Sequence, residues 1–422
     1  MLRKAAAVFA ILFVTANLVS AQISFDTPSK TTLQQEITAL DLSVPVAAPV
    51  EEKAKIDKEW TVMVFLNSKN NLEKYGLLDV NEMEKIGSSD KVNVVVEMGR
   101  INGYATNDGD WKTTRRFLIK KDNDFSKITS PVLADLGKTD MGDYKSLIAF
   151  VKWAKATYPA KKYALIVWNH GSGWDKTRAL GLTKGISYDD ETGNHITTPQ
   201  LGQALKEMGG VNVYGSDACL MQMPEVTYEI KNYTEYIVGS EETEPGDGYT
   251  YDLWLGPVVA KGNMTSYELG KAAVDGYSNH YQQIGEASTQ SLLKTSALKD
   301  FNVLVNDFVA TAMDANEKAL VKTAASGAQS YAVYDNKDMA HFFSRYAATT
   351  KNADVKMKAL ALKSYIDGTL IVHNRVNGNF TDGNSHGMSA YMPSYSFNGD
   401  YMELAWARDG QWDEFIKWYQ AK

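Results

Sequence analysis

One cysteine and one histidine in this 422-residue chain have the chemistry for acyl transfer. Cys219 is the only cysteine, and it follows a short apolar run over residues 211–215. His170 follows a similar run over residues 163–168 and precedes Gly171. A thiol beside an imidazole can attack a carbonyl carbon, because the imidazole takes up the thiol proton. The two residues are therefore a candidate catalytic dyad.

The two apolar runs must bring this dyad together. Each is bounded by glycine, and a helical pattern separates them, which is typical of neighbouring parallel strands. Loops at the carboxyl ends of such strands lie at one sheet edge, where ligands bind. The N–H groups of Gly171 and Cys219 could hold the oxyanion that forms there. The alternatives are a histidine that only completes a turn and a cysteine that is buried and inert.

Two aspartates suggest a binding pocket beside the cysteine. Asp217 lies two residues before Cys219, so an extended backbone places both side chains on one face. A buried carboxylate raises a thiol pKa, which opposes reactivity unless the site holds a cation such as a substrate arginine or lysine. Asp247, in a glycine-flanked loop, could form a second wall of this pocket. The alternatives are a helix cap for Asp217 and a turn aspartate at 247.

The amino terminus is typical of an exported protein. Arg3 and Lys4 precede an apolar run over residues 5–19, and small residues at 19–21 resemble a cleavage site. We expect residues 1–21 to be a signal peptide and residues 22–58 an extension, linker or pro-segment. The run is short for a membrane span and no lipid-anchor cysteine follows it, so we expect a secreted or periplasmic protein without a stable membrane anchor. A net charge of −7 disfavours nucleic acid as a partner.

Alternating strand and helix patterns predict an α/β fold with a mostly parallel sheet. We expect a catalytic core over residues 59–264. Residues 265–422 are predicted to be mainly helical and to return one strand, 387–391, to the core. Residues 174–194 are predicted to be a long loop, and loops of this length tend to be functional.

Metal motifs are weak in this sequence. Residues 122–126 begin like a calcium loop, but Lys127 and Leu133 stand where glycine and glutamate are required. The acidic run 189–191 is a second option for calcium, with a solvated turn as the alternative. No Gly-x-Ser-x-Gly elbow of a serine hydrolase occurs. We expect no metal site and no required cofactor, and we leave calcium as an option.

Several sequence blocks resemble the clostripain family of cysteine peptidases, relatives of caspases, gingipains and legumains. The most specific blocks are Trp-Asn-His-Gly-Ser-Gly-Trp at 168–174 and Ser-Asp-Ala-Cys-Leu-Met at 216–221, and the match extends over residues 60–420. The resemblance implies a caspase-like three-layer sandwich with His170 and Cys219 as the dyad. It also implies that Asp217 selects arginine or lysine before the scissile bond. Asn169 departs from the family, which often has aspartate there.

The resemblance further implies activation by self-cleavage between the histidine and the cysteine. Lys184 is the preferred site, because Gly185 follows it and its surroundings carry less charge than those of Lys176. A tethered loop near a cleft is a substrate at high effective concentration. We therefore expect an exported endopeptidase that cleaves protein or peptide substrates after Arg or Lys. The alternatives are a protease-sensitive surface loop and, for the whole chain, a catalytically silent module that binds cationic peptides.

Overall fold

The structure is a computed structural model that describes residues 57–174 and 185–421. The predicted signal peptide, nearly all of the predicted extension over residues 22–58, and Lys184 lie outside the described residues. The described residues belong to one compact unit. Within the described part, no helix is long and apolar enough to cross a membrane.

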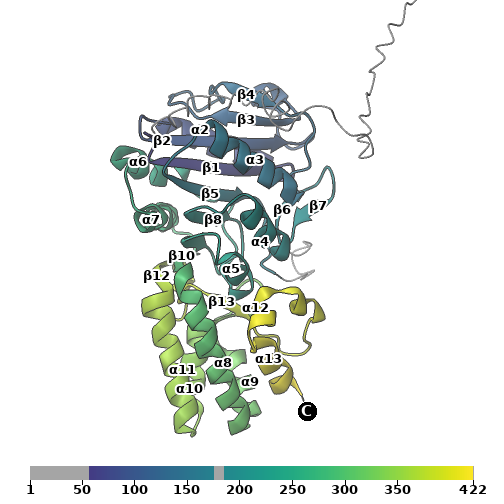
Figure 1. Cartoon of the computed structure of the whole chain (residues 1–422), viewed down its shortest axis with the longest axis vertical. Coiled ribbons are helices and arrows are strands. Elements are labelled where there is room, and N and C mark those ends of the chain that lie inside the picture. Colours follow the sequence, from purple (N-terminus) through teal and green to yellow (C-terminus); the bar gives the residue numbers. More distant parts are fainter. Residues whose placement is uncertain (1–56, 175–184, 422) are drawn as a thin grey trace, which may run out of the picture. The chain divides into compact units, whose positions relative to one another are not determined.

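A nine-stranded sheet forms the centre of the described chain, in the order β12-β10-β9-β8-β5-β1-β2-β3-β4 (Figure 1). Five neighbouring strands in its middle run parallel, as the alternating strand and helix patterns predict. These parallel strands are β1 (Trp60–Ser68), β2 (Val92–Arg100), β5 (Lys162–Trp168), β8 (Val213–Asp217) and β9 (Tyr236–Gly239). The chain adds β2 on one side of β1 and β5 on the other, so the strand order reverses at this point, where α/β proteins bind ligands.

Antiparallel strands complete both edges of the sheet. On one edge, β3 (Thr114–Leu118) pairs with β2, and β4 (Val132–Asp135) pairs with β3. On the other edge, β10 (Ser288–Lys294) pairs with β9 and with β12 (Ile371–Asn377). The central sheet therefore takes strands from both sides of residue 264.

Helices cover both faces of the sheet, which gives the three-layer sandwich predicted from the sequence. Alternate residues of β1 show the two faces: Val62 and Val64 pack in one hydrophobic cluster, and Met63 and Phe65 in the other. The first cluster includes side chains of α2 (Glu73–Ile86), α6 (Tyr251–Lys261) and α7 (Ser266–Ile284). The second includes side chains of α3 (Tyr144–Thr157), α4 (Thr198–Glu207) and α5 (Pro224–Ile230).

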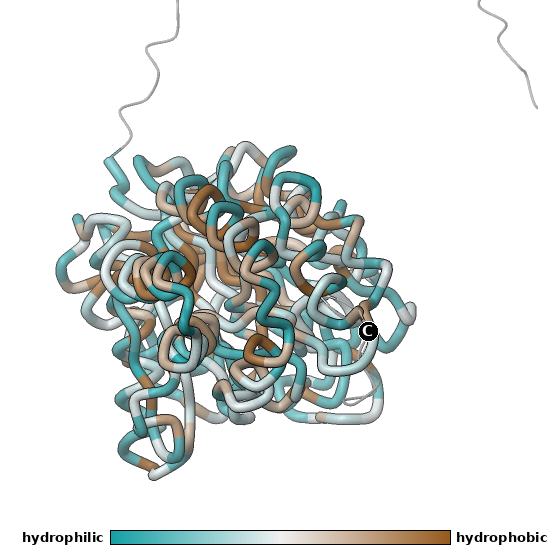
Figure 2. The backbone as a smooth tube through the Cα atoms, turned by 90° about the horizontal axis from the view of Figure 1, so that it is seen from below, coloured by the Kyte–Doolittle hydropathy of each residue, from teal (hydrophilic) through white to brown (hydrophobic). Residues whose placement is uncertain are grey.

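The carboxyl-terminal portion adds six helices to the second cluster. They are α8 (Leu298–Ala315), α9 (Lys318–Gly327), α10 (Met339–Thr349), α11 (Ala353–Tyr365), α12 (Ala405–Asp409) and α13 (Trp412–Gln420). In the view from below, many brown, hydrophobic stretches lie towards the middle, and much of the outline is teal or white (Figure 2). The core thus continues from the sheet into this helical portion.

Three sequence-based expectations differ from the structure. The strand predicted at 387–391 forms as β13 (Ser389–Tyr391), but it pairs with β11 (Asn336–Asp338) in a separate two-stranded sheet. The strands that do join the central sheet, β10 and β12, are rich in polar residues, so an apolar-run criterion misses them. The predicted loop over residues 174–194 contains part of a hairpin, β6 (Ile186–Asp189) and β7 (Asn194–Ile196).

Candidate active site

The register of β5 against β8 places His170 level with Cys219. Trp168 is paired with Asp217, and the Asn169 N–H donates to the Asp217 carbonyl at 3.1 Å. A Cβ built on Gly171 would lie 2.5 Å from the carbonyl oxygen of Cys219, so only glycine fits this approach. The sequence prediction that both loops meet at one sheet edge is confirmed by this geometry.

A cavity of about 110 Å³ lies at this edge. Both members of the dyad line it, together with two carboxyl side chains and the backbone of a glycine-containing loop; these residues are Asp217, Glu244, Gly246 and Gly248. A thiol, an imidazole and two carboxyl groups therefore surround one small space.

The Cys219 thiol is held in its neutral form. Its Sγ accepts a hydrogen bond from the Glu244 backbone N–H at 3.3 Å. Burial, and then the nearby Glu244 carboxylate, raise the pKa of Cys219 to about 12. A histidine partner by itself would lower a thiol pKa. In this state burial and the Glu244 carboxylate outweigh that effect. The sequence predicted a carboxylate beside the thiol but named Asp217, whereas Glu244 is the carboxylate that raises the thiol pKa.

The rate at which Cys219 is alkylated should show that its thiol is neutral. At pH 7.5 Cys219 of the uncut chain should be alkylated at least about a hundredfold more slowly than a free cysteine with a pKa of about 8.5. Because the pKa is raised, the rate should keep increasing with pH well above pH 9. Glu244→Gln should accelerate alkylation at pH values where Glu244 is ionised, since it removes a nearby negative charge. Iodoacetamide labelling followed by mass spectrometry checks this, and a rate equal to that of free cysteine would contradict the neutral thiol.

His170 is positioned by a residue that the sequence reasoning missed. Its Nε2 lies 2.7 Å from Oδ1 of Asn71, which follows β1. If Nε2–H donates to this amide oxygen, Nδ1 is left as the proton acceptor. Burial lowers the pKa of His170, so the ring is neutral near pH 7 and can serve as a base. The sequence places Asn71 just after β1, the strand adjacent to β5, and this position could have identified it as a partner of His170.

Asp217 lies inside the pocket and does not cap a helix. The following helix, α5, has Met223 as its N-cap residue, so the capping alternative does not hold. Asp217 is 4% exposed, and its two oxygens accept hydrogen bonds from the Tyr249 N–H at 3.0 Å and the Tyr251 hydroxyl at 2.9 Å. Burial raises the pKa of Asp217 to about 7. The carboxyl group is thus fixed in place and costly to ionise.

Glu244 is a second pocket acid that sequence reasoning missed. Burial and the adjacent Asp217 raise its pKa well above the ordinary range. One carboxyl oxygen, Oε2, is buried and has no hydrogen-bond donor among residues 57–174 and 185–421. A third buried acid, Asp79, accepts from the Trp168 indole at 2.6 Å, and burial and Asp217 raise its pKa as well. The acidic segment 241–244 follows β9 at the same sheet edge, and this position could have identified Glu244 from the sequence.

Asp247 does not line the cavity in this structure. Its side chain is 48% exposed and lies 3.3 Å from Nε2 of His280. Its neighbours Gly246 and Gly248 do line the cavity. Gly248 has φ of 55°, and a Cβ there would lie 2.7 Å from Oδ1 of Asp217, so the loop closes over Asp217 through glycine backbone. The predicted second wall is therefore formed by Glu244 in place of Asp247.

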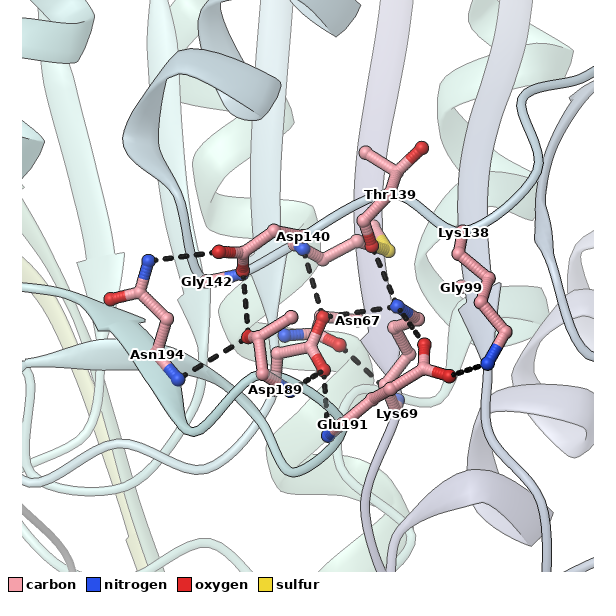
Figure 3. A network of polar contacts seen from close by, with 12 residues as sticks. Asn67, Lys69, Gly99, Lys138, Thr139, Asp140, Gly142, Asp189, Glu191 and Asn194 are labelled. Carbon is pink, nitrogen blue, oxygen red and sulfur yellow. Dashed lines mark hydrogen bonds and ion pairs between the residues drawn. The ribbon is translucent and has the colours of Figure 1, made fainter.

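A buried ion pair anchors the β6–β7 hairpin beside the dyad (Figure 3). The Lys69 ammonium lies 3.2 Å from Asp189, 2.8 Å from Glu191 and 2.6 Å from the Thr139 carbonyl. The side chains of Lys69 and Asp189 are fully buried. Lys69 follows β1, so this pair fixes the hairpin to the sheet edge that carries the site.

Asn169 joins this hairpin to the turn that carries His170. Its amide nitrogen donates to the carbonyls of Asn67 at 2.5 Å and Tyr188 at 3.2 Å, and its amide oxygen accepts from the Tyr188 N–H at 2.8 Å. An aspartate could not make both donor contacts in its ionised form. The hairpin contacts therefore explain why asparagine suits the position where the resembled family often has aspartate.

Removing the buried cation should destabilise the fold. Lys69→Met leaves Asp189 buried without its cation, which costs about 3–5 kcal/mol of unfolding free energy. Lys138→Met is the matched control, because Lys138 is 73% exposed and pairs with Glu191 only at the surface. Urea denaturation measures both variants. Equal stability of the two would contradict a structural role for the buried pair.

The contacts of Asp189 leave little room for a metal ion at the acidic run 189–191. Asp189, one of the residues considered for calcium, is occupied by Lys69 and by the Met141 N–H. Over the described residues, no group of three or more histidine, cysteine, aspartate or glutamate side chains is arranged to hold a metal ion. The options of calcium and of no required cofactor both stay predictions.

Comparisons with known proteins give one family match and one curated relative. The model of the clostripain family, Peptidase_C11, matches residues 64–419. Clostripain of Hathewaya histolytica is 27% identical over 231 residues, which cover 49% of this chain and 43% of that protein. The matched region thus spans less than half of that curated relative.

Solved structures agree on the fold. A secreted C11 cysteine protease from Bacteroides thetaiotaomicron, in complex with an irreversible peptide inhibitor, has a TM-score of 0.64 at 18% identity, covering 84% of this chain and 99% of that one. An inactive zymogen C11 protease from Parabacteroides distasonis has a TM-score of 0.60 at 18% identity, covering 84% and 98%. Because the family model also covers most of the sequence, the chain belongs to the clostripain family of cysteine peptidases.

Proposed function

We propose that this protein is an endopeptidase that cleaves after arginine or lysine. The observation that carries the proposal is the pair of buried acids, Asp217 and Glu244, in the cavity shared with His170 and Cys219. A substrate ammonium or guanidinium would supply the donor that Glu244 Oε2 lacks and would offset the burial of both carboxylates. Arginine suits two adjacent carboxylates because its guanidinium offers several N–H donors in one plane.

The dyad can carry out peptide hydrolysis in two steps. His170 takes the thiol proton as Cys219 Sγ attacks the carbonyl carbon before the scissile bond, and the N–H groups of Gly171 and Cys219 face the oxyanion. His170 then protonates the leaving amine, which leaves a thioester on Cys219. Water, deprotonated by His170, attacks the thioester and releases the carboxylic acid and the thiol.

The substrate cation also has a role in activating the thiol. The Glu244 carboxylate contributes to the raised pKa of Cys219 in the empty pocket. A guanidinium bound at Asp217 and Glu244 would compensate this negative charge and lower the thiol pKa. Cys219 would then ionise only when a basic side chain fills the pocket, which couples recognition to reactivity.

A panel of fluorogenic peptides tests this function. Peptides that differ only in the residue before the reporter group (Arg, Lys, Gln or Asp) are incubated with the purified protein, and kcat/KM is measured. We expect turnover of Arg and Lys peptides at least about a hundredfold above that of Gln, since Gln cannot pair with a buried charge. Equal turnover of Gln and Arg peptides would overturn the specificity, and no turnover of any peptide by the cut form would overturn the activity.

We also propose that the chain is exported and activates itself by cutting after Lys184. The described residues at both ends of this segment are held together: the Ser172 N–H donates to the Gly185 carbonyl at 3.0 Å, and Gly171 pairs with Ile186. Trp174, before the segment, is buried against Tyr391 and Tyr401. A cut between Trp174 and Gly185 would therefore leave two chains joined through the sheet. The zymogen and secreted neighbours are consistent with this proposal.

Asn71 should affect turnover more than substrate binding. Asn71→Ala removes the acceptor that orients His170, so kcat should fall about tenfold while KM changes little. Asn263→Ala is a matched control, because Asn263 is also exposed and lies outside the cavity lining. Steady-state kinetics on an Arg peptide measure both variants. Unchanged kcat in Asn71→Ala would mean that the hydrogen bond does not position the histidine.

A further inference from the structure

A second cavity lies between three helices of the carboxyl-terminal portion and has a volume of about 360 Å³. Helix α10 supplies one wall with His341, Ser344 and Arg345, which share a helix face because residues three and four apart are neighbours. Helices α9 and α11 and the segment 383–386 supply the remaining walls. Figure 1 shows α9 in green and α10 and α11 in yellow-green, in the same helical portion of the chain.

The lining of this cavity is basic. Four of its side chains are cationic or become cationic on protonation, and none of the lining residues is acidic; these four are His341, Arg345, Lys363 and His386. The whole chain carries a net charge of −7, so a cavity lined by positive and no negative side chains differs from the overall charge of the protein. Buried or half-buried cations that gather in this way repel one another unless an anion is present.

Only part of this charge is balanced within the protein. Asp367 lies 2.5 Å from the Lys363 ammonium and 2.8 Å from Nδ1 of His386. For the Arg345 side chain the described residues provide no ion pair or hydrogen bond, and its Nε is buried without an acceptor. A buried donor that lacks an acceptor costs free energy, which a bound ligand could recover. Arg345 is therefore the group in this cavity that most requires an anionic partner.

Other donors are arranged around Arg345. Nδ1 of His341 accepts from the Gln329 N–H at 3.0 Å, so the proton of the neutral ring is on Nε2. Ser344 and Asn384 add a hydroxyl and an amide to the lining. Donors thus come from α10, α11 and the 383–386 segment. A tetrahedral oxyanion can use more donor directions than a planar carboxylate can, and arginine binds phosphate oxygens in bidentate fashion.

We propose that this cavity binds a small molecule that carries a phosphate or sulfate group, with Arg345 as the main ligand to that group. Lys363, His341 and His386 surround the anion, and Ser344 and Asn384 donate further hydrogen bonds. The volume leaves space beside the anion for the rest of a small ester. This site is separate from the peptidase cavity, because the two share no lining residue, and it does not depend on the proposed specificity.

Ligand-induced stabilisation tests the proposal on the full protein. Inorganic phosphate and sulfate should raise the Tm of the wild type more than acetate or chloride at equal ionic strength, since a ligand that binds only the folded state stabilises it. Arg345→Gln should weaken the phosphate Kd at least tenfold in isothermal titration. The matched control is Arg408→Gln, because Arg408 is 55% exposed and lies outside the cavity lining; it should bind phosphate like the wild type.

A second variant covers the case in which Arg345→Gln fails to fold. Ser344→Asp keeps Arg345 and places a carboxylate in the cavity, so it should also weaken phosphate binding at least tenfold. The proposal is overturned if phosphate and sulfate leave the wild-type Tm unchanged, or if acetate stabilises as much as phosphate. It is also overturned if a folded Arg345→Gln or Ser344→Asp variant binds phosphate with the wild-type Kd.

Discussion

Cys219→Ala should leave the purified protein a single chain, where the wild type becomes two. The substitution removes the nucleophile, so kcat on an Arg peptide should fall by about 10⁴-fold or more, the scale on which hydrolases lose activity without their nucleophile. The same loss should stop self-cleavage, because the cut after Lys184 is expected to use this thiol. Gel electrophoresis and mass spectrometry of the purified proteins follow the cut, which should expose Gly185 as a new amino terminus.

Two lysine variants separate self-processing from simple protease sensitivity. Lys184→Ala should abolish the cut at its site, whereas Lys176→Ala should leave that cut unchanged. Both leave the dyad intact, so any difference between them reflects the site of cleavage. If Cys219→Ala is still cleaved after Lys184 with no other protease present, the processing is not carried out by this protein.

Asp217→Asn should cause the largest loss of specificity. The asparagine keeps the shape and removes the charge; its amide oxygen can still accept from the Tyr249 N–H, and its NH2 group can donate to the Tyr251 hydroxyl. Losing one partner of a buried, hydrogen-bonded charge pair costs about 2–5 kcal/mol of transition-state binding, so kcat/KM for Arg peptides should fall about 30-fold to several thousandfold. Asp247→Asn is the matched control, because Asp247 is half exposed and lies outside the cavity lining; its effect should stay below about tenfold.

The pH dependence of binding should follow from the raised pKa of Asp217. With a pKa of about 7 in the empty pocket, this carboxyl is protonated below pH 7 and ionised above it. A guanidinium prefers the ionised form, so KM for an Arg peptide should fall as pH rises from 6 to 8. Steady-state kinetics across this range measure the effect. A KM that rises over the same interval, or equal kcat/KM in folded Asp217→Asn and wild type, would contradict the assignment of Asp217.

The sequence predicts those residues of the site that directly follow a strand recognisable from its own apolar sequence. The runs before His170 and Cys219 are apolar and end in glycine or polar turns, so the same stretch of sequence predicts both the strand and its candidate catalytic residue. Asp217 follows from the same run, since it lies two residues before the cysteine. The central parallel strands and the three-layer class are predicted for this reason.

The parts that the sequence does not predict depend on pairing between distant segments. Asn71 and Glu244 reach the site from the ends of β1 and β9, and no local spacing relates them to Cys219. Strands β10 and β12 can be identified only from their pairing in the sheet, because their sequences are rich in polar residues and contain no long apolar run. The role of Asn169 likewise requires the hairpin that its amide contacts.

Covalent labelling can show directly whether Cys219 is the nucleophile of a peptidase selective for basic side chains. The cut protein is treated with two irreversible peptide inhibitors that differ only in Arg or Asp before the reactive group, and adducts are located by mass spectrometry. We expect one adduct, on Cys219, formed by the Arg inhibitor at least about a hundredfold faster than by the Asp inhibitor. Labelling at another residue, or equal rates with both inhibitors, would contradict it.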